Sequence, residues 1–329
     1  MQRVAVIGAG NMGRRHANAY AQIPEAEIVA VFDLHAEAAE ELAGIYSASA
    51  FTDFEELLAN VETDVIDICT PTPSHLEYIT AAAEAGKHIC SEKPLARTTA
   101  EAQEAVRVCK EAGVTLFVAQ VLRWFPEFRK LHDLIKSGAV GEPVEVRTSR
   151  CGAPPSGTDD WFADYKRSGG VALDLIIHDY DWLRWCFGKV CRVYARGLYE
   201  MKDFNGDYAL VTLRFESGAI AHIEGSWARL SGFETSVEVA GTEGLLSFSN
   251  VDSRPLVVEM KAKDGSTNSV VIAESPIATN PYYLELKHFI DCLETGKAPD
   301  VSPEDGLEAV RIGEAALRSI SAGQPVLLA

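Results

Sequence analysis

The sequence predicts an α/β protein with two domains. Residues 1–121 are expected to form a parallel sheet with helices on both faces, and residues 122–329 an α+β domain on a large, open, mainly antiparallel sheet. Three observations support this. Short apolar runs alternate with helical stretches up to residue 119, a glycine-rich loop follows the first run, and strand patterns with short turns crowd together after residue 189. A length of 329 residues also fits two domains of about 150 residues each.

The first element is a buried strand over 4–7, followed by the loop Gly8-Ala9-Gly10-Asn11-Met12-Gly13 and a helix over 14–22. The first two glycines let the backbone turn and approach a pyrophosphate, and the third lets helix and strand pack closely. The start of the helix offers free N–H groups to the phosphates. This pattern predicts a Rossmann domain that binds a dinucleotide through Gly8, Gly10, Asn11, Met12 and Gly13.

A second strand over 27–32 ends in Asp33, about 20 residues after the last glycine of the loop, where an acid binds the adenosine ribose hydroxyls. The alternative is a solvated carboxylate at a strand end. Leu34 and His35 follow, so no arginine is placed to accept a 2′-phosphate. The sequence therefore favours NAD over NADP as the cofactor.

The first domain continues with helices predicted over 36–43, 54–59, 75–85 and 99–112, and strands over 64–69, 87–91 and 115–119. Two of these strands end in motifs. Thr70-Pro71-Thr72-Pro73 forces a turn, and Glu92-Lys93-Pro94 follows the next strand. Ligands bind at the carboxyl edge of such a sheet, so Lys93 can reach into a cleft there. The alternative is an ordinary surface lysine.

The second domain begins with a helix predicted over 126–137 and a strand over 144–151. The loop over 152–168 carries Trp161, which either caps a sugar ring or fills the core. A helix then runs from Gly169 to about residue 186. At roughly 100° per residue, Asp174, His178 and Asp181 lie within about 60° of one another on it.

A stripe of two acids and a histidine on an otherwise apolar helix predicts a cavity, because buried charge needs a partner. The carboxylates can orient the imidazole and tune its basicity, as a general base requires. A satisfied core histidine is the alternative.

The remaining segments predict strands over 190–197, 208–215, 219–226, 235–240, 245–249 and 256–260, and helices over 282–294 and 303–321. Helices can cover only one face of this sheet. The other face is therefore expected to be buried against further copies of the chain.

Composition excludes several classes of function. A formal charge of −18 argues against nucleic acid or an anionic membrane as partner. Seven cysteines without a CxxC pair or clustered metal ligands predict free thiols, no metal site and a reducing, cytoplasmic location. The N-terminus lacks a signal-peptide pattern, and no uncharged apolar run reaches the roughly 18 residues of a membrane span.

The motifs together resemble the family of glucose–fructose oxidoreductase, inositol dehydrogenase and rhizopine-catabolism proteins (Gfo/Idh/MocA). The resemblance covers nearly the whole chain. It rests on the glycine loop, the segment from Cys69 to His75, Glu92-Lys93-Pro94, and Gly169-Gly170 with Asp174 and His178. The stretch from His178 to Trp185 looks closest to the inositol dehydrogenases.

The resemblance implies a role for each matching residue. Lys93 would bind the reacting hydroxyl, His178 would be the general base, and Asp174 would orient the site. Substrate contacts are further implied for Asp181 and Arg123, whereas the loop of Trp161 matches no pattern for one sugar. Cofactor contacts are implied for Thr70, Pro71, His75, Glu92, Lys93 and Gln120. A homodimer or homotetramer through the C-terminal sheet is also implied.

The predicted function is therefore NAD-dependent hydride transfer between a hydroxyl carbon of a cyclic polyol or sugar and nicotinamide. Two alternatives stay open. One is a non-catalytic regulatory protein that binds NAD(P), since a fold does not determine a function. The other is a glycosidase-like enzyme that oxidises its sugar only transiently with tightly held NAD, and net NADH release separates it from a dehydrogenase.

Overall fold

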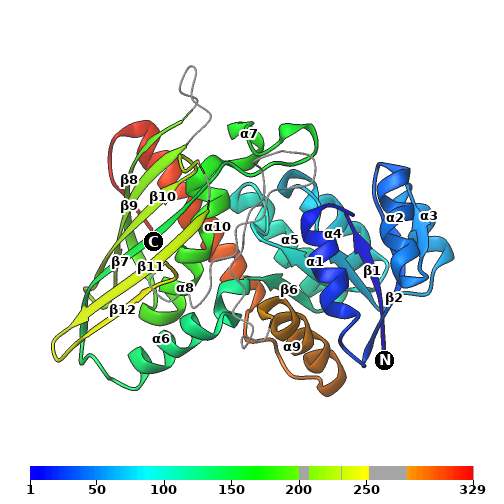
Figure 1. Ribbon diagram of the computed structural model, residues 1–329, viewed down its shortest axis with the longest axis horizontal. Coiled ribbons are helices and arrows are strands. Elements are labelled where there is room, and N and C mark those ends of the chain that lie inside the picture. Colours follow the sequence, from blue (N-terminus) through cyan, green and yellow to red (C-terminus); the bar gives the residue numbers. More distant parts are fainter. Residues whose placement is uncertain (200–206, 231, 252–279, 329) are drawn as a thin grey trace. The chain divides into compact units, whose positions relative to one another are not determined.

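The computed structural model describes residues 1–199, 207–230, 232–251 and 280–328, and its chain divides into two units (Figure 1). Unit 1 contains Met1–Trp124 and Thr279–Arg311, and unit 2 contains Phe125–Ala278 and Ile312–Ala329. The predicted boundary at 121/122 lies close to the first crossing. The prediction of a single domain over 122–329 differs from this division, because 279–311 returns to the first unit.

Unit 1 is built on a six-stranded sheet in the order β3-β2-β1-β4-β5-β6. Every neighbouring pair in it is parallel, which confirms the predicted Rossmann sheet. The strands are β1 (Gln2–Ile7), β2 (Ala26–Phe32), β3 (Ser49–Phe51), β4 (Val65–Ile68), β5 (His88–Glu92) and β6 (Leu116–Ala119). The strand order reverses between β1 and β4, and sheets of this kind bind ligands at such a point.

Helices lie between the strands of unit 1, and side chains cap the first turns of some of them. They are α1 (Asn11–Tyr20), α2 (Ala36–Tyr46), α3 (Phe54–Asn60), α4 (His75–Glu84) and α5 (Thr99–Ala112), with short 3₁₀ turns η1 (Thr72–Ser74) and η2 (Val121–Trp124). The Asp53 side chain accepts the Glu56 N–H at the start of α3. Thr98 and Glu101 form a capping box at α5.

The returning segment completes unit 1 through α9 (Pro281–Thr295), which packs on α1 and η2. Phe117 of β6 stacks on Phe289 of α9 with ring centroids 5.1 Å apart. The amphipathic pattern of the α9 segment predicts a helix correctly. It does not indicate which of the two sheets the apolar face of that helix covers. The boundary at Arg311 falls inside the next helix, α10 (Pro303–Ala322).

Unit 2 is built on a seven-stranded sheet in the order β12-β11-β7-β10-β9-β8-β13. Its strands are β7 (Pro143–Gly152), β8 (Val190–Leu198), β9 (Tyr208–Phe215), β10 (Ile220–Ser226), β11 (Phe233–Gly241), β12 (Leu245–Ser249) and β13 (Val326–Leu327). Among the described strands only the pair β7–β10 is parallel, so the prediction of a mainly antiparallel sheet is confirmed. The predicted strand over 256–260 lies outside the described residues.

Helices cover one face of this sheet. The helical elements of unit 2 include α6 (Pro126–Lys136), the short η3 (Thr158–Asp160) and α7 (Tyr165–Ser168), the π-helical turn η4 (Val171–Leu175), which packs on β9 and β10, and α8 (Ile177–Phe187). Figure 1 shows α8 and α10 beside the strands, and the Ala195 N–H of β8 donates to the Ser319 hydroxyl of α10. Among the described residues, no helix combines the length and apolar character needed to span a bilayer.

Candidate active site

The glycine loop has the geometry that its sequence predicts. Gly8 has φ +102°, and a Cβ there would lie 2.9 Å from the Cys69 carbonyl oxygen. A Cβ on Gly13 would lie 1.8 Å from the Gly8 carbonyl oxygen, so only glycine lets α1 approach β1 this closely. A Cβ on Gly10 would meet no described atom within 4 Å. The loop therefore leaves open space at the position where a pyrophosphate approaches the backbone.

Asp33 is attached to this loop at the carboxyl end of β2. Its Oδ2 accepts the Ala9 N–H at 2.8 Å, and its Oδ1 accepts the His35 N–H at 2.9 Å. A carboxylate has about four acceptor positions, so two remain for ribose hydroxyls. The two backbone bonds hold the carboxylate in place before any ligand arrives.

The loop after β4 is joined to the Glu92–Pro94 turn by a buried histidine. Nδ1 of His75 lies 2.9 Å from the Pro94 carbonyl oxygen, and its Nε2 lies 2.9 Å from that of Thr70. Burial lowers the pKa of His75. Pro71 is fixed through its carbonyl, which accepts the Ser74 hydroxyl. Because both nitrogens of His75 face main-chain carbonyls, its side chain braces two loops, and its contact with a cofactor stays a prediction.

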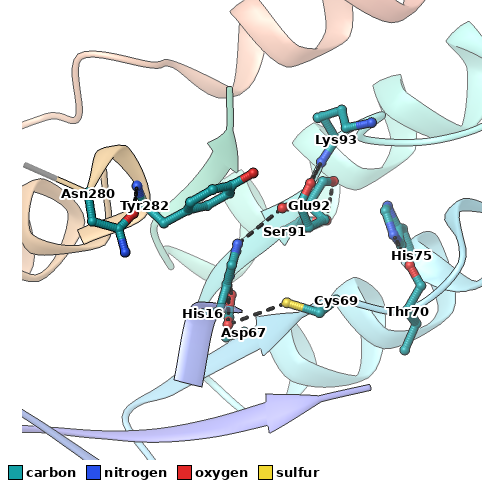
Figure 2. Close-up of polar contacts among 10 residues, drawn as sticks. All are labelled: His16, Asp67, Cys69, Thr70, His75, Ser91, Glu92, Lys93, Asn280 and Tyr282. Carbon is teal, nitrogen blue, oxygen red and sulfur yellow. Dashed lines mark hydrogen bonds and ion pairs between the residues drawn. The ribbon is translucent and has the colours of Figure 1, made fainter. Parts of the chain in front are cut away.

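The Glu92–Pro94 turn follows β5, and both carboxylate oxygens of Glu92 are engaged (Figure 2). Oε1 lies 3.1 Å from Nε2 of His16, and Oε2 accepts the Lys93 N–H at 2.9 Å. The other ring nitrogen of His16, Nδ1, lies 3.0 Å from Oδ2 of Asp67. The side chain of Lys93 is partly exposed.

Sequence reasoning missed His16 and Asp67, which are both fully buried. Burial lowers the pKa of His16, but the charges and hydrogen bonds of Asp67 and Cys69 together outweigh it, so that pKa lies well above its usual value. Burial raises the pKa of Glu92, but the hydrogen bonds and charges of His16 and Lys93 together more than offset it, so that pKa is lowered. The three groups form a charged chain of carboxylate, imidazolium and carboxylate.

Ligand atoms of His16, Asp67 and Cys90 lie within 4.8 Å of one another, a spacing that a metal ion could use. Both nitrogens of His16, however, already face carboxylates. Burial raises the pKa of the Cys90 thiol well above its usual value, and a protonated thiol is a poor metal ligand. This geometry is that of an ion-pair network.

In unit 2, the segment with the predicted catalytic acid and base is not a uniform helix. Asp174 lies in the π-helical turn η4, and Ile176, with φ −85° and ψ 7°, separates that turn from α8. The prediction of one α-helix from Gly169 was wrong in its first turns, so the angle of 100° per residue holds only for His178 and Asp181. Asp174 and Asp181 are buried, and His178 is partly exposed. Single π turns are frequent at functional sites.

A buried ion pair fixes α8 to the sheet. Nε of Arg150 in β7 lies 2.6 Å from Oδ2 of Asp179, and the two side chains are 5% and 2% exposed. Asp179 directly follows His178 in α8, so the pair fixes the rotation of the helix beside the predicted base. The close packing of η4 on β10 is also visible at Gly225, where a Cβ would lie 2.5 Å from Val171.

The other predicted ligands lie in different environments. Gln120, after β6, is fully buried, and neither atom of its side-chain amide has a hydrogen-bond partner among the described residues. Arg123 is buried and donates to the Asp300 carbonyl at 3.1 Å. Trp161 is 8% exposed and packs against Phe162. Gln120 thus suits a ligand best, because a buried amide without a partner is costly.

Comparison with known proteins identifies the family. A family model described as "Oxidoreductase family, NAD-binding Rossmann fold" matches residues 2–120. A second model, the GFO/IDH/MocA C-terminal domain, matches residues 128–247. The chain belongs to the Gfo/Idh/MocA family. It is therefore an oxidoreductase whose first unit binds NAD, as its sequence predicts.

Full-length relatives agree with this assignment. The Bacillus subtilis protein named "Uncharacterized oxidoreductase YrbE" is 35% identical, with 98% of this chain and 95% of that protein covered. The myo-inositol 2-dehydrogenase of Thermotoga maritima is 34% identical, with coverages of 99% and 98%. The crystal structure of GenD2 from gentamicin A biosynthesis in complex with NAD superposes with a TM-score of 0.90 at 27% identity, covering 100% of this chain and 96% of that one.

In this Gfo/Idh/MocA chain, the sheet edge formed by the carboxyl ends of the strands of unit 1 has features that fit NAD. The open space at Gly10, the anchored carboxylate of Asp33 and the unsatisfied amide of Gln120 all lie at the carboxyl ends of strands of one parallel sheet. Thr70 and Lys93 follow two further strands at the same edge. Asp174, His178 and Asp181 belong to unit 2, so their predicted meeting with Lys93 stays a prediction.

Proposed function

We propose that this protein is an NAD-dependent dehydrogenase that oxidises a hydroxyl-bearing carbon of a cyclic polyol or sugar, with an inositol as the first candidate substrate. The observation that carries the proposal is the relative named myo-inositol 2-dehydrogenase, which is 34% identical over nearly the whole of both chains. Lys93, Asp174 and His178 are all present, and a chain that had lost turnover would be free to lose them.

In the proposed mechanism, His178 accepts the proton of the reacting hydroxyl while a hydride leaves the same carbon. The alcohol thereby loses a proton and a hydride and becomes a carbonyl. When bound, NAD⁺ supplies the redox chemistry by accepting the hydride. The ammonium of Lys93 stabilises the developing oxyanion, Asp174 orients the imidazole, and Asp181 holds neighbouring hydroxyls of the substrate.

Features of each unit support these roles. Asp174 and Asp181 are buried carboxylates four positions before and three positions after the partly exposed His178, which suits a base whose ring is oriented by an acid. The buried Arg150–Asp179 pair holds the turn of α8 that carries His178 against the sheet. In unit 1, Lys93 follows β5 at the edge that carries the nucleotide loop.

The test is formation of NADH, measured by absorbance, with NAD or NADP and a panel of inositols and aldoses. We expect one polyol to give NADH, and both Lys93→Met and His178→Ala to lower kcat by about 10²–10⁴-fold. Lys87→Met is the matched control, because Lys87 precedes the opposite end of β5 and donates to the Thr63 carbonyl.

Two outcomes would overturn the proposal. NAD binding without turnover of any polyol or sugar would favour a regulatory protein. Hydrolysis of a glycoside without net NADH would favour the glycosidase-like reaction.

We further propose that the protein self-associates through the exposed face of the sheet in unit 2 and resides in the cytoplasm. Tyr194, Leu198 and Leu210 are exposed large side chains on β8 and β9. All seven cysteines are free, which supports a reducing compartment. Sedimentation of wild type and Leu210→Glu tests the interface, and a monomeric wild type would contradict it.

A further inference from the structure

The backbone on both sides of Lys93 is held by buried histidines from two helices. His16 of α1 reaches the Glu92 carboxylate, whose second oxygen accepts the Lys93 N–H at 2.9 Å. His75 of α4 reaches the Pro94 carbonyl at 2.9 Å. Figure 2 shows His16 and His75 approaching the turn from different elements. Both imidazoles are 0% exposed, so neither can itself touch a substrate.

The contacts of His16 determine which of its nitrogens carry protons. Its two ring nitrogens face two carboxylates, and only the imidazolium donates from both. The chain Asp67–His16–Glu92 therefore contains one positive and two negative charges inside the protein. Burying such a network is costly, and well-packed apolar side chains are often as stable.

The strands around this network are also held by backbone hydrogen bonds. Strands β4 and β5 are already paired through backbone hydrogen bonds, with Asp67 beside Cys90 in the register. The distinctive effect of the network is to hold the Glu92 side chain, and through it the Lys93 N–H, in one position. The buried charges of the network therefore act on the orientation of Lys93, the residue that the proposed mechanism places at the oxyanion.

We propose that the buried chain Asp67–His16–Glu92 is a positioning device for Lys93, in which His16 holds Glu92 and Glu92 holds the Lys93 backbone so that the ammonium is directed at the reacting oxygen. The inference rests on the proposed function, because Lys93 is the group positioned. It also gives Glu92 a role besides the predicted cofactor contact.

The experiment compares His16→Asn, Glu92→Gln and the double variant with wild type in steady-state turnover. A misplacement of about 1 Å can cost about 10²-fold, so we expect each single variant to lower kcat by about 10- to 100-fold. In His16→Asn the Kd for NAD should change by less than about threefold, because the substitution leaves every residue of the predicted cofactor contacts in place. The double variant should be no worse than the poorer single variant, since the residues act as a unit.

The matched control is His88→Asn. His88 lies at the other end of β5 and accepts the Thr115 N–H at 3.0 Å. We expect it to keep the wild-type kcat. An equal loss in His88→Asn, or multiplicative losses in the double variant, would make the effect one of general stability and overturn the proposal.

A second readout needs no substrate. Reductive methylation with isotopically labelled formaldehyde gives each lysine an NMR signal, and Lys93→Arg assigns that of Lys93. We expect this signal to shift or broaden in His16→Asn while the Lys87 signal stays unchanged. A shift of the Lys93 signal, together with a wild-type protein that turns over no polyol or sugar, would retain the positioning role and reject the proposed function. An unchanged signal, or a stoichiometric metal ion lost in His16→Asn, would overturn the positioning role itself.

Discussion

The Arg150–Asp179 pair allows a sharp test of how α8 is held. Replacing Asp179 by alanine leaves the Arg150 guanidinium without its carboxylate in a site where the two side chains are only 5% and 2% exposed. The rings of Phe128 and Phe233 lie 5.9 Å from the guanidinium, and they compensate a full charge poorly.

The expected cost follows from this burial. Removing one partner of a buried ion pair typically costs about 3–5 kcal/mol. In a unit of this size, each kcal/mol shifts Tm by about 2–4 °C, so Asp179→Ala should lower Tm by roughly 6–20 °C. Replacing both partners by apolar residues, as in Arg150→Met with Asp179→Leu, should recover most of the loss, because no charge is then left unpaired.

Thermal unfolding followed by circular dichroism measures these shifts. The control is Glu216→Ala, which breaks the exposed pair between Lys189 and Glu216, with exposures of 66% and 61%. Exposed pairs contribute little, so its Tm should stay at the wild-type value. A wild-type Tm for Asp179→Ala, or a double variant less stable than the single one, would refute the reasoning.

Three further predictions concern unit 1. Gly13→Ala should prevent NAD binding and lower Tm, because its Cβ would lie 1.8 Å from the Gly8 oxygen, whereas Gly10→Ala should keep the Tm and raise the Kd for NAD; calorimetry measures both. Asp33→Ser should lower the NAD to NADP ratio of kcat/KM by at least about tenfold, because the carboxylate repels a 2′-phosphate; an unchanged ratio would exclude Asp33 from this choice. Hydrogen bonding to an arginine lowers the pKa of Asp64 from 3.8 to about 2, so the stability that Asp64 contributes is present above pH 3.8 and lost as the pH falls through about 2. In an acid titration of unfolding, Asp64→Asn should therefore lose less stability than wild type over this range. Parallel stability curves for the two proteins would contradict this.

Much of the fold is predictable because it rests on local signals. The glycine loop, the apolar strands and the capping residue Asp53 each leave a pattern within a few positions, and the structure has all three. The parallel pairing of β7 with β10 leaves no such pattern, since strand periodicity indicates a buried face and not a neighbour.

The residues of the candidate site also differ in whether a local sequence pattern reveals them. Lys93 is visible through its motif, whereas His16 and Asp67 are separated by 51 positions and come together only through the fold. The π turn at Asp174 is also hidden, because sequence periodicity assumes a regular helix. Two features of the sequence could have revealed this network. His16 is a titratable residue on the apolar face of α1, and Asp67 is an acid inside the apolar strand β4.

The return of 279–311 to unit 1 has a consequence for synthesis on the ribosome. Phe117 and η2 pack against α9, which lies near the far end of the chain, so they lack this partner until α9 has been synthesised. At about 5–20 residues per second, α9 follows Trp124 only after roughly ten seconds or more. The nascent nucleotide domain therefore exposes an apolar surface throughout that interval, and a fragment ending at Trp124 would keep that surface permanently and be prone to aggregate.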